Sequence, residues 1–169
     1  PARLEFLDRI ADPDNPLSQL VPYIGTYRAQ EFLTTQVLEA MVTAANEIKR
    51  APLTGAPIDA VVITGDVTDN AQSNELDWYK RILDGGVVTP KSGDPHRSEA
   101  SHSSNADLYD SHYYHPDGPP TGMPADRPHV LHNFPHFKGA LEASERQFIA
   151  KGLTHKWLAV HGNHDALLQ

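Results

Sequence analysis

The sequence predicts an α/β protein built around a small parallel sheet, and two features indicate this. Two apolar runs, 61–64 and 157–160, contain β-branched or aromatic residues and are too brief for helices, so each is typical of a buried strand. Segments with helical periodicity lie before the first run and between the two runs. Because strands joined by a long helical crossover pair in parallel, we expect the two runs to be neighbours in one sheet.

The first helix is expected over residues 31–50, after an irregular start that is rich in turn residues. Its last residues, Lys49 and Arg50, suit the negative end of the helix dipole. Pro52 and Gly55 then break the chain before the first strand. The apolar positions that recur at helical spacing are Leu33, Val37, Met41, Ala44, Ala45 and Ile48.

Two further helices are expected between the strands. The second spans 73–84, with Ser73 or Asn74 as its N-cap and the pair Gly85-Gly86 as its stop. The third spans 137–152 and ends at a glycine before the second strand. The inward positions are Leu76, Tyr79 and Leu83 in the second helix, and Leu141, Phe148 and Ile149 in the third.

Residues 90–129 form a segment rich in Pro, His and Ser between the two halves. Seven of the 14 prolines and five of the ten histidines lie there, and Leu108 is its one branched aliphatic residue. Such a composition buries too little apolar surface to order itself alone, so a poorly packed insertion is expected. A substrate lid and an extra metal site are the functional alternatives. The histidines His129, His132, His136 and His161 are expected to be structural or solvated.

Composition narrows the class of protein. A chain of 169 residues predicts one domain. The net charge of −8 disfavours a nucleic-acid surface, which needs a basic face. Cysteine is absent, which excludes disulfides, thiolate metal sites and cysteine nucleophiles. No run of residues approaches a membrane span and no signal peptide is evident, so we expect a soluble protein, cytoplasmic or exported.

Polar side chains follow each predicted strand at once. The first run leads into Gly65-Asp66-Val67-Thr68-Asp69, and the second leads into Gly162-Asn163-His164-Asp165. Ligands of open α/β sheets bind just beyond the carboxyl ends of the strands, and glycine permits the close backbone approach needed there. Carboxylate, carboxamide and imidazole groups are ligands for divalent cations. The sequence therefore predicts a metal site at this edge.

Each of these side chains also fits another role. Asp66 can bridge two cations and Asn163 can bind one, but both residue types are common in turns. His164 fits a metal ligand, a proton donor to a substrate oxygen, or a surface imidazole. Asp69 can orient an imidazole or cap the helix that follows. Asp165 is expected to brace the loop backbone rather than to touch a substrate.

The motifs Gly65-Asp66-x-x-Asp69 and Gly162-Asn163-His164-Asp165 resemble the second and third signature motifs of the calcineurin-like metallophosphoesterases. Their order and their strand-then-loop setting match that family, and the resemblance extends over most of the chain outside 90–129. It implies the calcineurin-like fold, a β-sandwich flanked by helices, with a two-metal site on one rim.

The resemblance also implies roles and a reaction. Asp66 would bridge two divalent cations, which are Mn, Fe, Zn or Mg in this family, and Asn163 would bind the second cation. His164 would donate to an oxygen of the substrate, and Asp69 would orient His164. The implied activity is hydrolysis of a phosphomonoester or phosphodiester substrate. The alternative is a non-catalytic metal-binding or interaction module of the same fold.

Two further motifs of that family are missing from the printed sequence. No Asp-x-His follows a strand, and no Gly-His-x-His follows the motif at 162–165. We therefore expect residues 1–169 to be a single incomplete metallophosphoesterase domain, in which 90–129 is an insertion. Only Asp66 and Asn163 are matched metal ligands, so the chain alone is expected to hydrolyse phosphoesters poorly or not at all.

Overall fold

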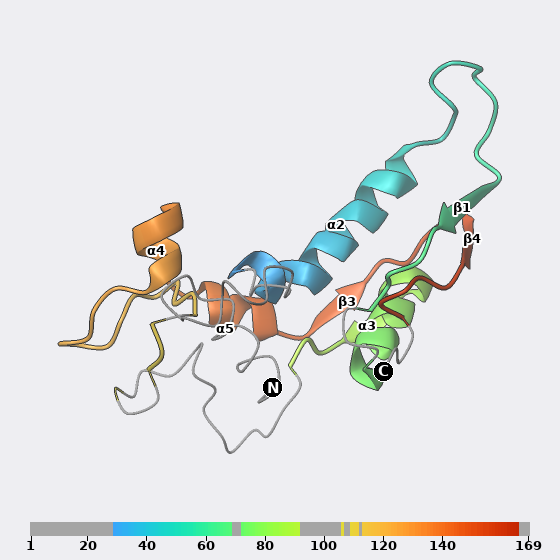
Figure 1. Ribbon diagram of the computed structural model, residues 1–169. Helices are drawn as coiled ribbons and strands as arrows, with labels where there is room; N and C mark the ends of the chain where they lie inside the picture. The colour runs from blue at the N-terminus through green and yellow to red at the C-terminus, as the bar shows by residue number, and fades with distance from the viewer. Residues whose placement is uncertain (1–28, 69–71, 92–105, 107–108, 112, 166–169) are drawn as a thin grey trace. The chain divides into compact units, whose positions relative to one another are not determined.

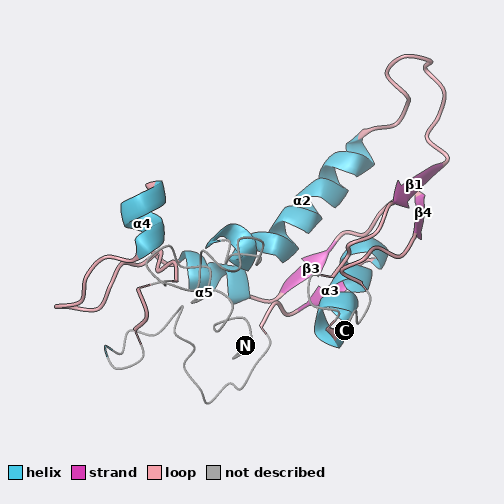
Figure 2. Cartoon of the chain, viewed as in Figure 1, coloured by secondary structure: helices cyan, strands magenta, loops and turns pink. Residues whose placement is uncertain are grey.

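The computed structural model describes residues 29–68, 72–91, 106, 109–111 and 113–165 (Figure 1). The chain divides into two compact units. One unit comprises Phe32–Arg97 with Gly139–Gln169, and it contains both predicted strands. The other comprises Pro1–Glu31 with Ser98–Lys138, which includes most of the segment rich in Pro, His and Ser. Helices and two small sheets together make this a mixed α/β protein, as predicted (Figure 2).

The predicted parallel pair is present. Strand β1 (Ala60–Ile63) pairs in parallel with β4 (Lys156–Ala159), and the two lie side by side in Figure 1. Ile63 is level with Ala159, and the N–H of Val160 donates to the carbonyl of Ile63 at 3.0 Å. Because the strands run in parallel and in register, their carboxyl ends lie at the same edge of the sheet. The chain segments that follow them therefore start together.

Two helices of this unit match the predicted ones closely, but their buried faces differ from the prediction. Helix α2 (Thr34–Glu47) follows a 3₁₀ turn, η2 (Ala29–Leu33), and helix α3 (Ser73–Asp84) ends at Gly85. The N-cap of α3 is Gln72 rather than Ser73 or Asn74, and a reciprocal capping box with Glu75 fixes it. Among the apolar positions named for these two helices, the exposed ones are Leu33, Val37, Met41, Ala44, Ile48 and Leu76. Ile149, predicted to point inward from the third helix, is also exposed.

The core lies where α2 and α3 meet the small sheets. Val42 supplies the buried position of α2, and Tyr79, Ile82 and Leu83 supply those of α3. Val88 and Ala150 complete the buried set, and partly buried side chains surround it, namely Leu38, Ile63, Val67, Trp78, Phe148, Leu153 and Trp157. The face of α2 that is buried is thus set by its contact with α3, not by the longest apolar stripe of its sequence.

A second sheet replaces the end of the third predicted helix. Helix α5 covers only Ala140–Glu145, and strand β3 (Phe148–Ala150) then pairs antiparallel with β2 (Gly86–Val88). The prediction of one helix over 137–152 is therefore wrong. Pairing with β2 satisfies the backbone of 148–150 and covers Phe148 against the core, which outweighs its helix-like spacing.

A close backbone contact fixes the start of β4. Gly152 has φ +74°, and a Cβ there would lie 2.7 Å from the backbone nitrogen of Gly85. The side chain of Asn46 donates to the carbonyl of Gly152 at 2.8 Å, and its oxygen accepts the N–H of Thr154 at 2.8 Å. Helix α2 and the end of α3 thereby hold the segment that leads into β4.

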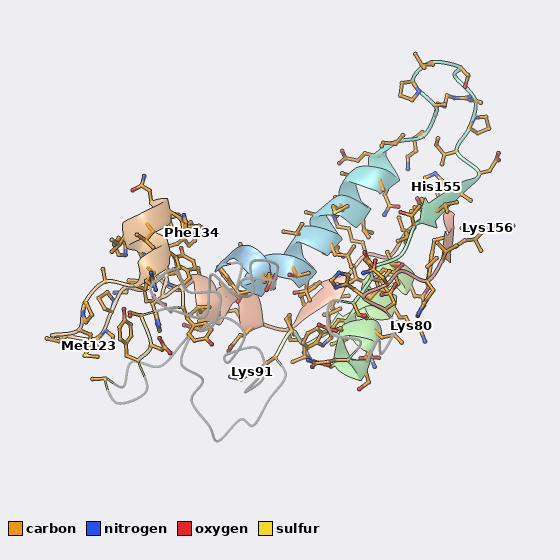
Figure 3. All side chains as sticks on the ribbon, in the orientation of Figure 1. Lys80, Lys91, Met123, Phe134, His155 and Lys156 are labelled. Carbon is orange, nitrogen blue, oxygen red and sulfur yellow. The ribbon has the colours of Figure 1, made fainter. Side chains whose placement is uncertain are left out.

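The other unit is better packed than the sequence suggests. Helix α4 (Arg127–His132) begins at the N-cap Asp126, and Figure 3 shows the labelled Phe134 next to it. The buried residues of this unit include Tyr114, His115 and Asp126. The expectation of poor packing for 90–129 is wrong for this described part, because an edge-on contact between Tyr114 and Phe134 and hydrogen bonds to Asp126 replace aliphatic burial. No helix among the described residues has the length and apolar character needed to cross a bilayer.

Candidate metal centre at the strand ends

Two loops leave the sheet at its carboxyl edge and pack against each other. We call residues 64–68 the β1 loop and residues 160–165 the β4 loop. Gly65 has φ +102°, and a Cβ there would lie 2.6 Å from the Cα of Gly162. A Cβ on Gly162 would lie 2.2 Å from Oδ1 of Asp66. Because no side chain fits at either position, the two glycines permit the loops to touch.

The carboxylate of Asp165 ties the two loops together. Its oxygens accept the backbone N–H groups of Asp66, Val67 and Thr68 from the β1 loop and of Gly162 from its own loop, at 2.7 to 2.8 Å. The hydroxyl of Thr68, which is buried, lies 3.2 Å from the same carboxylate. The predicted role of Asp165 as a brace for the loop backbone is confirmed.

The pKa of Asp165 records this environment. Desolvation by the surrounding loops raises the pKa of the carboxyl group, but the four backbone donors outweigh it and lower the pKa to about 2. Asp165 is therefore ionised throughout the neutral range. The negative charge of Asp165, which holds the two loops together, is therefore present without a bound ligand.

Asp66 lies at the centre of the contact between the loops. Its backbone has φ +54°, a left-handed conformation that is uncommon outside glycine and found mostly at turns and functional sites. Its Oδ1 accepts the N–H of His164 at 3.0 Å, and the residue is exposed. An ionised carboxylate has about four lone-pair sites, so this one bond leaves capacity for a cation.

The structure brings together three of the four predicted site residues. Asp66 is on the β1 loop, and Asn163 and His164 are exposed on the β4 loop. The backbone of His164 is held from both sides, because its N–H donates to Asp66 and its carbonyl accepts the hydroxyl of Thr68 at 3.3 Å. Asp69, and with it the predicted pairing of Asp69 with His164, lies outside the described residues.

The side chains at this edge of the sheet supply some, but not all, of the ligands that a divalent cation needs. Among the residues that the structure describes, which exclude Asp69, no group of three or more His, Asp and Glu side chains is arranged to hold a metal ion. Asp66 and Asn163 nevertheless supply the oxygen donors that hard divalent cations take, both on exposed loop positions at one edge. These two residues fit a metal as partial ligands.

Two residues near this edge were not assigned a site role from the sequence. Thr68 occupies a variable position of its motif, so nothing in one sequence marks its buried hydroxyl. Tyr79 was expected only as a core residue. Its hydroxyl is buried without a hydrogen-bond partner, and burial, together with the charge of Asp165, raises its pKa to about 12. Its ring packs edge-on against Trp157 of β4, with centroids 5.9 Å apart.

Comparison with known proteins adds no assignment. No protein-family model, curated protein or solved structure matches the chain.

Proposed function

We propose that this protein is a metal-dependent phosphoesterase of the calcineurin-like class, which hydrolyses a phosphomonoester or a phosphodiester. The observation that carries the proposal is the contact between the β1 and β4 loops. Two polar motifs that are 97 residues apart, from Asp66 to Asn163, meet at the carboxyl edge of a parallel strand pair. Ligand sites of α/β sheets lie at such edges.

The residues of the chain have distinct roles in this proposal. Asp66 and Asn163 would hold the cations, Asp66 as a bridge between two of them and Asn163 as a ligand of one. Two divalent cations, when bound, supply hydroxide from water and neutralise charge on the phosphoryl group. His164 donates a proton or a hydrogen bond to the oxygen that leaves or to a phosphoryl oxygen, and Asp69 orients its imidazole.

The hydrogen bonds that join the two loops support the same proposal. A catalytic group misplaced by about 1 Å can lose about 10²-fold in rate, so site residues on loops need a rigid support. Asp165 supports both loops here, because its carboxylate accepts four backbone N–H groups, including that of Asp66, whose φ is +54°. A plain surface turn needs no such brace.

The test uses the full-length natural protein with Mn²⁺, an aryl phosphate and a bis-aryl phosphodiester. Asn163→Ala should reduce both bound Mn²⁺ and turnover, because it removes a ligand. His164→Ala should reduce turnover by roughly 10²- to 10⁴-fold and leave bound Mn²⁺ unchanged, as expected for a proton donor. The matched control is His155→Ala, an imidazole beside the opposite end of β4 (Figure 3), which should change neither.

Three outcomes separate the alternatives. Equal loss of metal and turnover in His164→Ala would make this imidazole a ligand. Metal binding at Asp66 and Asn163 without hydrolysis of either ester would favour the non-catalytic metal-binding module. No Mn²⁺ binding and no turnover in the wild-type protein would overturn the proposal.

A further inference from the structure

The strongest unexplained group outside the strand-end loops is a buried acid–imidazole pair in the other unit. The Asp126 side chain has 0 % exposure and the His129 side chain 7 %. One Asp126 oxygen lies 2.6 Å from Nδ1 of His129. The same carboxylate accepts the backbone N–H of His129 at 3.0 Å and that of His115 at 3.1 Å. Asp126 is thus satisfied on all sides.

This pair bears on which nitrogen of His129 can bind a ligand. An ionised carboxylate accepts hydrogen bonds and donates none, so beside Asp126 the Nδ1 atom carries a proton, and in a neutral imidazole Nε2 then holds the lone pair. Nε2 is buried and has no hydrogen-bond partner among the described residues. Leaving such a group unpaired costs about 1–3 kcal/mol, so an orphan of this kind calls for an explanation.

Aromatic rings, rather than hydrogen-bond donors, surround the His129 imidazole. The ring of His136 stacks on it with centroids 4.0 Å apart and an angle of 23° between planes, and Tyr114 lies at 5.3 Å. His136 is exposed, whereas His129 is covered. The molecule therefore places a second, more accessible imidazole directly against the first.

A divalent late transition metal is the ligand that this chemistry suits. Imidazoles that bind metals almost always donate their other N–H to a carboxylate or carbonyl, and Asp126 is such a partner for His129. Imidazole nitrogen is a preferred ligand of Zn²⁺, Cu²⁺ and Ni²⁺. Mg²⁺ prefers oxygen ligands, so it should bind weakly to the imidazole nitrogens of His129 and His136.

We propose that His129 and His136 form a Zn²⁺-type metal site, with Asp126 as the positioning residue that orients His129. The two rings are nearly parallel in the structure, so their nitrogens do not converge as they stand. Binding requires the exposed His136 ring to turn out of the stack and present a nitrogen beside Nε2 of His129. Water completes the coordination, so the site is weaker than a four-ligand structural zinc site.

The experiment titrates Zn²⁺ into the full chain by calorimetry, in a background carrying Asp66→Asn and Asn163→Ala. This background removes the proposed ligands of the strand-end site, so the result does not depend on the phosphoesterase proposal. One Zn²⁺ should bind, and His129→Ala or His136→Ala should weaken binding by more than about 10-fold. Asp126→Asn should weaken it by about 10- to 100-fold. His155→Ala is the matched imidazole control and should bind as the background does.

A second measurement covers variants that fail to fold. His136 is exposed and contacts His129 by ring stacking, so His136→Ala should retain the thermal transition of the background. Nitrogen NMR of the background should show the Nε2 resonance of His129 shift on adding Zn²⁺. Unchanged Zn²⁺ affinity in His136→Ala, an unshifted Nε2 resonance, or no Zn²⁺ binding by the background would each overturn the proposal.

Discussion

Asp165 and Asp126 organise their surroundings with the same device, a carboxylate that accepts backbone N–H groups, but they do so in different environments. Asp165 is partly exposed and binds four N–H groups of two loops. Asp126 is fully buried and binds two N–H groups and one imidazole. The first joins segments that are far apart in sequence, whereas the second closes a short local structure.

The two carboxylates differ in which nearby side-chain atoms could bind a ligand. Asp165 accepts four backbone N–H groups and lies 3.2 Å from the hydroxyl of Thr68, and Asp66 and Asn163 are exposed on the loops that it joins. At Asp126 one partner is the imidazole of His129, whose Nδ1 lies 2.6 Å from the carboxylate. Both arrangements leave a potential ligand atom beside a rigid acid. In one case that atom is an exposed oxygen donor, and in the other it is a buried nitrogen.

The largest effect should come from Asp126→Ala. This change leaves two backbone N–H groups and the Nδ1–H of His129 without an acceptor in a buried place, at a cost of about 3–5 kcal/mol. Amide exchange of His115 and His129 should accelerate, and urea unfolding of this unit should shift to lower concentration. Asp117→Ala, at an exposed carboxylate of the same unit, should cost under about 1 kcal/mol. Equal shifts in both variants would contradict the central role given to Asp126.

Asp165→Asn should have a smaller effect that depends on pH. The neutral amide loses charge-assisted hydrogen bonds from four N–H groups, and we expect a loss of about 2–3 kcal/mol at pH 7. Because the folded pKa is lowered to about 2 from the ordinary 3.8, the stabilisation is present above pH ~4 and is lost as pH falls towards 2. The wild-type protein should therefore approach the variant in acid when unfolding is followed between pH 6 and 2. A difference that persists at pH 2 would rule out this linkage.

The sequence was sufficient for features that depend on neighbouring residues. The strands at 60–63 and 156–159 follow, within one residue, from the short apolar runs 61–64 and 157–160, which are β-branched or aromatic in part. Their parallel pairing follows from the helices between them. The brace formed by Asp165 was also predicted, because an Asp side chain in a loop commonly accepts hydrogen bonds from backbone N–H groups. The positions of the β1 and β4 loops could therefore be predicted from residues that are close together in the sequence.

Features set by distant partners could not be predicted in the same way. Phe148 and Ile149 have spacing compatible with a helix, and only pairing with 86–88 makes them a strand. The exposed stripe of α2, including Val37 and Met41, is as apolar as the buried one, so the position of α3 decides which is covered. Burial of Asp126 depends on the rings of Tyr114 and His129 and on the backbone N–H of His115, and no short sequence motif predicts these contacts.

The smallest effect should come from Tyr79→Phe, which tests whether a hydroxyl near Asp165 has a partner. The hydroxyl of Tyr79 is buried and unpaired, whereas that of Tyr114, in the unit of Asp126, donates to the carbonyl of Pro135 at 2.6 Å. Removing an unpaired hydroxyl should leave stability within about 0.5 kcal/mol or raise it, and Tyr114→Phe should cost about 1 kcal/mol. Thermal unfolding of the two variants gives this comparison directly.

Alkaline pH gives the Tyr79→Phe variant a second readout. Burial, and then the charge of Asp165, raise the folded pKa of Tyr79 from 10.0 to about 12, so the neutral phenol is the form that the folded state favours. Its contribution is complete below pH ~10 and is lost as pH rises through about 12. Tyr79→Phe should therefore lose less stability than the wild-type protein between pH 9 and 12. A loss above about 1 kcal/mol at pH 7 would instead show that the hydroxyl of Tyr79 has a hydrogen-bond partner in solution.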